Sequence, residues 1–493
     1  MWRHGHAQCL ALARRTYATS TLPHRVIPKL DRTVSRIGFG AYRVSTEKHA
    51  EALRNALQNG VNIIDTAANF ENGRSEAVVG ETLAALESSK QIQRESVTLV
   101  TKAGYLTSAD IDPSNNDYIQ INDHSYHSIS PSILEKQIKT SLDRLKTSKL
   151  DIFMINAPER MLMAKNRRYT ATQLYKDLEE TFEFLDSQVD SGIIGGYGVC
   201  SNSMALPLAV DHVSLSKVLQ SCKNLSNFVA VEVPFNLFER EAILNSDSVS
   251  DVSKKHDIFV MTNRPLNSIA NGKIRMLVNH TMGNGVSAEH ELMETMTRSF
   301  KQVSKLEAEM ASELPVEEES LTAKFVWGQV LSENLTRLAQ NHFATQHYLL
   351  RQVKPAVAKD IKELQGFVDQ LPAEEQKPYA DWMTKYQQGV DVLMDNIVSY
   401  AYMDTLRKNS ELDRIMSALC PSLGKQSEGE IHSPLSIKAL RFLLAHEQVG
   451  TVFTGMRDPL YVRDAMTAAQ RSVDQPIDPE DIADLLSFLE HNT

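Results

Sequence analysis

From residue 35 onward, short apolar runs alternate with amphipathic segments along the chain. This alternation is typical of repeated βα units, because a strand covered on both faces is apolar throughout while its covering helix buries only one stripe. Eight runs fit such strands: 37–41, 61–65, 97–102, 151–155, 193–198, 228–233, 258–262 and 451–455. Helical periodicity follows them, most clearly at 131–147, 172–191 and 434–446.

Eight parallel βα units predict an α/β fold, a (β/α)8 TIM barrel whose active site lies at the C-terminal ends of its strands. Such a barrel needs about 250 residues, whereas this chain has 493. Most of the excess falls between the seventh strand and its helix. The sequence therefore predicts four parts: a lead at 1–30, seven βα units at 31–274, an insertion at 275–430, and the rest of the barrel with a C-terminal helix at 431–493.

The insertion is expected to be entirely helical, since apolar residues recur in it at spacings of three and four. Three stripes run over 293–310, 349–371 and 379–397. Such stripes are more often the private core of a helical bundle than a docking surface. Because the insertion leaves from the C-terminal end of a strand, it is also a candidate lid or binding platform for a protein partner.

The first 30 residues differ from the rest in composition. Five Lys or Arg residues occur before the first acidic residue, Asp31, which is the composition of a mitochondrial transit peptide. Residues 15–18 resemble a presequence cleavage site and predict a mature start near Ala18, with the matrix as the destination. An untargeted disordered tail is the alternative.

Charge and composition exclude several classes of protein. The net charge of −10 argues against nucleic acid as a partner, and no apolar run approaches the roughly 18 to 20 residues of a membrane span. The four cysteines form no CxxC pair, and neither they nor the 15 histidines show metal-ligand spacing. We therefore expect no metal and no disulfide framework.

Several ordered motifs follow the predicted strands. Residues 62–76 read NIIDTAANFENGRSE, 97–102 read VTLVTK, and 198–202 read GVCSN. Together they resemble the aldo-keto reductases, a family of (β/α)8 barrels that pass hydride between NADPH, less often NADH, and carbonyl substrates. The resemblance runs from about residue 35 to 264 and resumes from 433 to about 470, so this chain looks like a divergent member with a helical insertion.

The resemblance implies four catalytic positions at the barrel mouth. The family places there an Asp, a Tyr that donates the proton, a Lys that lowers the pKa of that Tyr, and a His. Asp65 and Lys102 occupy two of these positions, whereas Phe70 stands at the Tyr position and Asn156 at the His position. Phe has no proton to give, and Asn can orient a carbonyl but cannot titrate.

Three interpretations of Asp65 and Lys102 remain open: a working site, a buried ion pair kept for stability, or inherited positions in a protein that only binds nucleotide. A replacement acid is conceivable in Tyr105, His124 or His127, all in loops that leave the third strand, although each is more simply a loop residue. Lys102 itself is a further candidate, because burial depresses the pKa of an amine.

The resemblance also implies a cofactor site for NADP, with NAD less favoured. Ser201 and Asn202 match the turn that holds the nicotinamide carboxamide, Glu232 replaces a usual Gln in the same contact, and Asn263 stands where an aromatic residue commonly stacks on the ring. Three further candidates for the phosphates are Arg264, Gly455 and Arg457, in the segments 263–266 and 454–459.

These observations predict an NADP(H)-dependent oxidoreductase that acts on a small carbonyl or alcohol substrate with altered catalytic residues. The alternative is a pseudoenzyme, a catalytically silent barrel that binds nucleotide or a protein partner through its helical insertion. The retained Asp65, Lys102 and Arg457 favour the first, and the absent hydroxyl and imidazole at Phe70 and Asn156 favour the second.

Overall fold

The computed structural model describes residues 22–112, 114, 117–166, 168–245, 247–270, 273–278, 289–314, 319–424 and 434–492. Residues 1–21, which contain most of the predicted presequence and its expected cleavage point, lie outside the described residues. The chain divides into two compact units, one of Met1–Ser268 with Leu419–Thr493 and the other of Ile269–Ala418. For comparison, the sequence suggested an insertion over 275–430.

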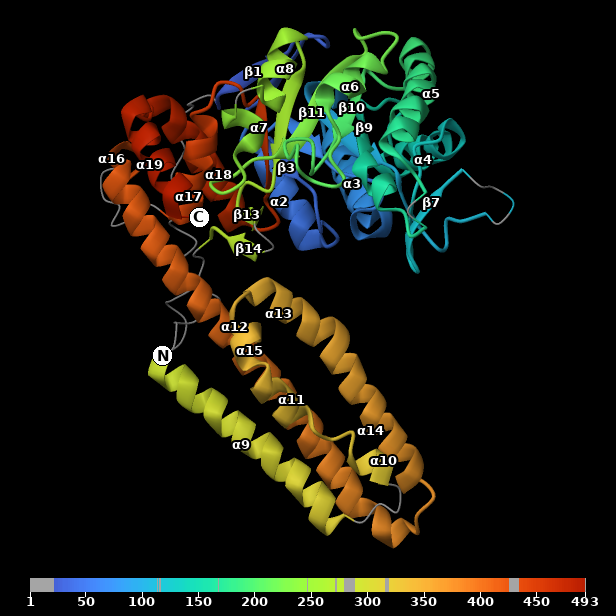
Figure 1. Cartoon of the computed structure of the whole chain (residues 1–493), viewed down its shortest axis with the longest axis vertical. Helices are drawn as coiled ribbons and strands as arrows, with labels where there is room; N and C mark the ends of the chain where they lie inside the picture. The colour runs from blue at the N-terminus through green and yellow to red at the C-terminus, as the bar shows by residue number, and fades with distance from the viewer. Residues whose placement is uncertain are drawn as a thin grey trace. The chain divides into compact units, whose positions relative to one another are not determined.

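The first unit is a closed barrel of eight parallel strands, which confirms the predicted (β/α)8 fold (Figure 1). Its strands are β3 (Ile37–Gly40), β4 (Ile63–Asp65), β5 (Thr98–Ala103), β9 (Ile152–Asn156), β10 (Tyr197–Cys200), β11 (Phe228–Pro234), β12 (Phe259–Asn263) and β15 (Thr451–Gly455). β15 pairs with both β12 and β3 and so closes the barrel. All eight predicted strands are present, and their residues are almost all buried because the sheet is covered on both faces.

Helices follow the strands and cover the outside of the barrel (Figure 1). They are α2 (Glu47–Gln58), α3 (Arg74–Ser88), α4 (Pro131–Leu145), α5 (Ala171–Asp190), α6 (Leu215–Gln220), α7 (Glu241–Leu244), α8 (Val249–Lys255), α16 (Pro421–Gly424), α17 (Leu435–Leu444), α18 (Pro459–Asp474) and α19 (Pro479–Asn492). Several begin at side-chain caps: Thr46, Thr170 and Asp458 each accept a backbone N–H of the first turn. The predicted helices at 131–147, 172–191 and 434–446 are confirmed within two residues at each end.

A short hairpin precedes the first barrel strand and packs against the barrel interior. β1 (His24–Ile27) pairs antiparallel with β2 (Arg32–Ser35), and Ile27 and Val34 are completely buried against side chains of the barrel interior. Lys29 Nζ donates hydrogen bonds of 2.8 and 3.0 Å to the carbonyls of Leu225 and Phe228. Residues 22–30 are therefore ordered, which differs from the disordered lead expected over 1–30, because two apolar side chains find a place in the barrel core.

The fifth barrel strand begins later than the sequence suggested, at Tyr197 instead of residue 193. The preceding glycines lie too close to their neighbours for a side chain: a Cβ on Gly195 would lie 2.6 Å from Asp151 O, and one on Gly196 would lie 2.5 Å from Val229 Cγ1. This stretch still crosses the sheet, with a parallel bridge from Ile194 to Leu150. Only the continuous hydrogen-bonded pairing of the strand begins later, at Tyr197.

Besides the β1–β2 hairpin, two small sheets of the described residues have no counterpart in the sequence-based prediction. β6 (Tyr105–Thr107), β7 (Ile119–Asn122) and β8 (Ser125–His127) form an antiparallel sheet after β5, and β13 (Asn267–Ala270) pairs with β14 (Lys273–Met276). The described residues also form the 3-10 helices η2 (Phe70–Gly73), η3 (Arg94–Ser96) and η4 (Pro158–Met163). Strands of three or four residues are too short to show a readable alternation of polar and apolar side chains.

The second unit is helical, as predicted. Its helices are α9 (Glu289–Glu313), α10 (Glu319–Thr322), α11 (Trp327–Glu333), α12 (Leu335–Ala339), α13 (His342–Tyr348), the π-helix η5 (Leu349–Val353), α14 (Lys354–Val368) and α15 (Ala373–Leu419), the last of which ends one residue into the other unit. The three predicted stripes meet in one core around Val303, Leu364, Trp382 and Leu393, which confirms the private core. Met293 is an exception at 40% exposure.

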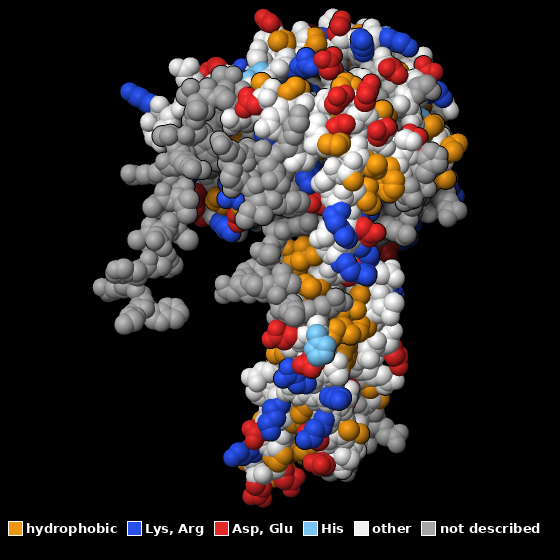
Figure 2. Space-filling model, turned by 90° about the vertical axis from the view of Figure 1, so that its left-hand side faces the viewer, with side chains coloured by type: hydrophobic (Ala, Val, Ile, Leu, Met, Phe, Trp, Pro, Cys, Tyr) orange, Lys and Arg blue, Asp and Glu red, His pale blue; other side chains and the backbone are white. Residues whose placement is uncertain are grey.

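The surface of the helical unit in Figure 2 mixes acidic and basic side chains, with isolated hydrophobic ones between them. No single sign of charge dominates that face. Among the helices that the structure describes, none combines the length and the apolar character that crossing a bilayer requires.

Candidate active site

The C-terminal ends of the barrel strands gather the polar residues that the sequence singled out. Asp65, Asn156, Cys200, Asn263 and Gly455 are each the last residue of a strand, while Lys102 and Glu232 lie one and two residues before the ends of theirs. Parallel strands of a barrel all end at the same face, so residues distant in sequence meet there.

Lys102 lies at the centre of this group. Its Nζ is hydrogen-bonded to Asp65 Oδ1 and lies 3.1 Å from Glu232 Oε2 and 3.2 Å from the carbonyl of Thr66. All three charged side chains are at most 7% exposed. The structure thus brings Asp65 and Lys102 together as expected, and it adds a second carboxylate.

The three charges shift one another's protonation. Burial raises the pKa of Asp65 to about 8, with the carboxylate of Glu232 adding to the rise and Lys102 opposing it. Burial by itself lowers the pKa of Lys102, but Asp65 and Glu232 outweigh it, and the net result is a raised pKa. The expectation that Lys102 has the depressed pKa of a buried amine is therefore wrong, because two carboxylates stabilise its ammonium form.

Phe70 lies next to this ion group. Its ring centroid is 5.4 Å from Lys102 Nζ, and it makes an edge contact with Tyr42 at 5.1 Å between ring centroids. The turn that carries it is tight: Glu71 and Asn72 both have positive φ, and so does Gly73. The structure therefore places Phe70 beside Lys102, in agreement with its assignment to the Tyr position at the barrel mouth.

Asn156 ends β9 and is buried, and its Nδ2 donates a 3.2 Å hydrogen bond to Oδ1 of Asn69. Asn69 belongs to the same loop as Phe70, so the loops after β4 and β9 meet at the mouth. An amide in this place can donate to a carbonyl oxygen of a substrate, but it has no titrating proton.

The structure also locates the three candidate replacement acids. His127 is fully buried, its Nε2 bonds to the carbonyl of Asn156 at 2.7 Å, and burial lowers its pKa to about 4, so it is neutral near pH 7. Tyr105 accepts a 3.3 Å hydrogen bond from Arg160 Nε, and burial raises its pKa. His124 lies exposed in the turn between β7 and β8. Burial thus makes Tyr105 a weaker acid and leaves His127 without the acidic proton of an imidazolium.

Ser201 and Asn202 follow β10 in a turn held by a carboxylate. The backbone N–H of Asn202 donates a 2.8 Å hydrogen bond to Oε1 of Glu159, a buried residue of η4. Burial raises the pKa of Glu159, and the hydrogen bond from Asn202 opposes this. Ser201 is buried and accepts a 3.3 Å bond from the N–H of Ser203.

Glu232 and Asn263 form a pair on neighbouring strands. Asn263 Nδ2 donates a 2.7 Å hydrogen bond to Glu232 Oε1, so both oxygens of Glu232 face charged or polar groups inside the barrel. Asn263 Oδ1 is buried, and within the part of the chain that the structure describes it has no hydrogen-bond donor. This oxygen can accept from an amide of a bound molecule.

The phosphate candidates differ in their environment. Arg264 forms a 2.6 Å ion pair with Glu239, so its charge is already compensated. Arg457, just before the N-terminus of α18, makes no hydrogen bond or ion pair with the described residues. Burial and nearby Arg43 lower the pKa of Arg457. Gly455 borders open space, and a Cβ there would meet no atom within 4 Å.

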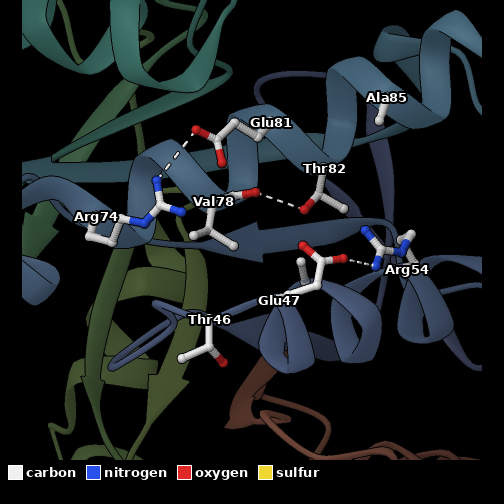
Figure 3. Close-up of a pocket in the computed structure, with 9 residues that line it drawn as sticks. Thr46, Glu47, Arg54, Arg74, Val78, Glu81, Thr82 and Ala85 are labelled. Atoms are coloured by element: carbon white, nitrogen blue, oxygen red, sulfur yellow. Dashed lines mark hydrogen bonds and ion pairs between the residues drawn. The ribbon is translucent and has the colours of Figure 1, made fainter.

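One surface pocket lies away from the predicted residues of the barrel mouth. A pocket of about 190 Å³ lies between α2 and α3, and its charged walls are the ion pairs Arg54–Glu47 and Arg74–Glu81 (Figure 3). It contains none of the predicted site residues. Over the described parts of the chain, no group of three or more His, Cys, Asp or Glu side chains is arranged to hold a metal ion.

Three residues of the site were not assigned a role from the sequence: Asn69, Glu159 and Glu239, the partners of Asn156, Asn202 and Arg264. All three lie within a few residues of a predicted strand end. Closeness in sequence to a predicted strand end could therefore have indicated these residues, but it does not reveal which side chains contact each other.

Comparison with known proteins agrees with this architecture. The family model for the Aldo/keto reductase family matches residues 36–342, more than half of the chain. The chain therefore belongs to the aldo/keto reductase family. It is 24% identical over 238 residues to the uncharacterized oxidoreductase YqkF of Bacillus subtilis, covering 48% of this chain and 62% of that protein.

Two further relatives carry more specific names. An NADP-dependent D-sorbitol-6-phosphate dehydrogenase of Malus domestica is 24% identical over 249 residues, covering 48% of this chain and 66% of that protein. An NADH-specific methylglyoxal reductase of Escherichia coli is 27% identical over 135 residues, covering 25% of this chain and 38% of that protein. The chain thus spans less than two thirds of the length of these relatives.

Among solved structures, the aldo-keto reductase from Bacillus halodurans in its holo form matches with a TM-score of 0.38 at 19% identity, covering 56% of this chain and 77% of that one. The glycerol dehydrogenase from Gluconobacter oxydans matches with a TM-score of 0.46 at 14% identity, covering 92% of this chain and 97% of that one.

Proposed function

We propose that this chain is an NADP(H)-dependent oxidoreductase that interconverts a small carbonyl compound and its alcohol. The observation that carries the proposal is the buried contact of Lys102 with Asp65 at the barrel mouth, beside Phe70 and Asn156. A buried ion pair is costly unless it is well compensated, so its presence at the mouth favours a chemical role over a purely structural one.

The residues at the mouth fit a dinucleotide. Asn263 Oδ1 is a buried acceptor without a donor among the described residues, which suits the amide of a nicotinamide. Arg457 is a cation without a hydrogen-bond or ion-pair partner in the described chain, next to the start of a 16-residue helix, which suits a phosphate. Ser201 and Asn202 would complete the contact with the nicotinamide side. Arg264, whose charge Glu239 compensates, would offer the pyrophosphate an N–H donor.

When bound, the nicotinamide supplies or accepts hydride, and the residues of the chain do the rest. Asn156 would donate its amide N–H to the carbonyl oxygen of the substrate. Lys102 would stabilise the negative charge that develops on that oxygen, since its raised pKa favours the ammonium form when the substrate binds. Phe70 and Tyr42 offer apolar surface to the substrate on the other side.

The preference for NADP over NAD rests on Arg457, because NADP carries one more phosphate for a cation to bind. Relatives of the chain are named for either cofactor: one as NADP-dependent, another as NADH-specific. We expect the dissociation constant of NADPH to be lower than that of NADH.

A second function is favoured by one observation: the ring that lies over Lys102 belongs to Phe70 and has no hydroxyl. On this proposal the barrel is a pseudoenzyme that binds nucleotide without turnover, and its helical unit serves a protein partner. The two proposals differ in turnover, not in binding.

Titration of the purified chain from Ala18 with NADPH and NADH, followed by nucleotide fluorescence, tests binding. Consumption of NADPH with a panel of aldehydes and ketones then tests turnover. Binding with turnover supports the oxidoreductase; binding without turnover supports the pseudoenzyme; absence of binding contradicts both.

The mitochondrial matrix is proposed as the location on the composition of the first 30 residues alone. A fusion of residues 1–30 to a fluorescent protein should enter mitochondria, and replacing Arg14 and Arg15 by Ala should prevent this. Diffuse fluorescence of the unaltered fusion would contradict the proposal.

A further inference from the structure

The barrel mouth holds one more buried carboxylate than the lysine can neutralise. Glu232 lies on β11, three strands from β5 around the barrel, so its side chain reaches across the interior to Lys102. Asp65 reaches the same ammonium from β4. Two carboxylates and one ammonium leave a net negative charge in a place where water is largely excluded, which is unfavourable.

The contacts of Glu232 show where a compensating proton belongs. Its Oε1 accepts from Asn263, whereas its Oε2 is buried and, within the described chain, receives no hydrogen bond, although Lys102 Nζ is 3.1 Å away. The carboxyl groups of Asp65 and Glu232 both contact Lys102 Nζ, and Glu232 contributes to raising the pKa of Asp65. Two ionised carboxylates cannot bond to each other, but a carboxylic acid donates to a carboxylate.

We propose that Asp65 and Glu232 share one proton beside Lys102, and that this carboxyl pair is the net proton donor for the carbonyl reduction proposed above. The donor role rests on that proposed function, whereas the shared proton does not. A pair of carboxyl groups held together keeps one proton to a higher pH than either would alone.

The proton balance of the step is as follows. The π bond of the substrate carbonyl breaks. Its carbon gains a C–H bond with hydride from a C–H bond of the reduced nicotinamide nucleotide, which is thereby oxidised, and its oxygen gains an O–H bond with a proton that leaves an N–H bond of Lys102. The shared carboxyl proton then moves to the Lys102 amine and restores the ammonium. Both carboxylates are left ionised until a proton from solvent reloads the pair. In alcohol oxidation the same transfers run in reverse.

The other groups around the pair titrate differently from it or do not titrate. Burial and the charge of Glu232 raise the pKa of the Cys200 thiol on β10, and burial lowers that of His127 to about 4. Asn263 on β12 cannot titrate, and Glu159 of η4 faces Cys200 and Asn202. The pKa of about 8 for Asp65 agrees with one proton retained at neutral pH.

Infrared spectroscopy of the nucleotide-free full chain detects the shared proton directly through the C=O stretch of a protonated carboxyl group. Between about pH 6 and about pH 10, we expect one such band to disappear with a midpoint near 8. The band should be absent from Glu232→Gln, because Asp65 then faces Lys102 alone and ionises. It should persist in Glu307→Gln, a matched control that removes a carboxyl of raised pKa from the helical unit.

Steady-state kinetics test the donor role. Turnover of the unaltered chain should fall as pH rises through 8, while Glu232→Gln should be slower by roughly 10²-fold or more at about pH 6 and lose this pH dependence. NADPH affinity and near-ultraviolet circular dichroism of the variant establish that the site is still folded.

The outcomes separate the two proposals. Identical infrared spectra of Glu232→Gln and the unaltered chain at about pH 6 would overturn the shared proton, whatever the activity. If the unaltered chain shows the band but Glu232→Gln turns over substrate at the same rate, the donor role is overturned. The band present with bound NADPH and no turnover of any carbonyl would overturn the oxidoreductase and the donor role together, leaving the shared proton in place.

Discussion

The ring of Phe70 lies with its centroid 5.4 Å from Nζ of Lys102, so an aromatic ring already occupies the space next to the ammonium. A hydroxyl on that ring would have a cation beside it, which lowers the pKa of a phenol and makes it a better proton donor. Phe70 is half-buried and its neighbour Tyr42 is exposed, so the added oxygen also has access to the mouth.

The double variant Phe70→Tyr with Asn156→His should therefore gain carbonyl reductase activity. An acid of this kind contributes typically 10²- to 10⁴-fold in rate, and we expect an increase of that order in kcat with little change in NADPH affinity. The measurement is NADPH consumption with an aldehyde panel. The single variant Asn156→His, which adds no phenol, is the control. An unchanged rate in the double variant with NADPH bound would contradict the assignment of Phe70 and Asn156 to the Tyr and His positions.

The stability of the barrel should depend on pH through the proton held at Asp65. A carboxyl whose pKa is raised by folding binds its proton more tightly in the folded state, so its contribution to stability is present at low pH and lost as pH rises towards 8. His127, with a pKa lowered to about 4, acts in the opposite direction below its ordinary value of 6.5. Between 6.5 and about 8 the contribution of His127 is small, and comparison with Glu232→Gln separates the carboxyl pair from other groups of raised pKa such as Glu159 and Glu307.

Across that window, the free energy of unfolding of the unaltered chain should fall with pH more steeply than that of Glu232→Gln. Urea unfolding at several pH values, followed by circular dichroism, measures both slopes. Parallel slopes in the two proteins would mean that Asp65 does not hold a proton in the folded state.

Replacement of Arg457 by Gln should weaken NADPH more than NADH. A hydrogen bond between charged groups contributes about 1.5 to 3 kcal/mol, which corresponds to about 10- to 100-fold in the dissociation constant of NADPH. Fluorescence titration measures both nucleotides. Arg54→Gln, which removes an equal charge from the outer surface of α2, should leave both affinities unchanged; an equal loss for NADPH and NADH would contradict a role for Arg457 in cofactor choice.

Tryptophan fluorescence should follow the unfolding of the helical unit, because two of the three tryptophans, Trp327 and Trp382, belong to it. Leu393→Ala removes a fully buried side chain from its core and should lower the free energy of unfolding of this unit by about 2 to 5 kcal/mol. Tryptophan fluorescence during urea unfolding measures the shift. The neighbouring Val392 is 52% exposed, and Val392→Ala should shift the transition far less; equal shifts would contradict the packing described.

The barrel strands and the helical core were predictable because both follow from local periodicity. A buried strand such as β9 is apolar throughout, and a stripe such as that containing Leu393 repeats every three or four residues. The hairpin of β1 and β2 escaped prediction because its composition is that of a basic lead, and only the barrel interior gives Ile27 a buried environment.

The candidate site was predictable as a set of positions but not as a set of contacts. Asp65 and Lys102 were expected together at the mouth because the resemblance to the aldo-keto reductases places them there, and the structure has them on adjacent strands. The approach of Glu232 to Lys102 crosses the barrel, and no linear pattern encodes a distance across an interior. The direction of the Lys102 pKa shift was missed for the same reason, since it depends on how many carboxylates surround the amine.

β15 closes the barrel between β12 and β3, and this arrangement constrains synthesis of the chain. Thr451 Oγ1 donates to the carbonyl of Ser35, so partners 416 residues apart must meet before the sheet has no edges. Until residue 455 has left the ribosome, β3 and β12 present unpaired backbone groups, which are templates for aggregation. The nascent chain should therefore depend on chaperones while its helical unit, made of local contacts, is already folding.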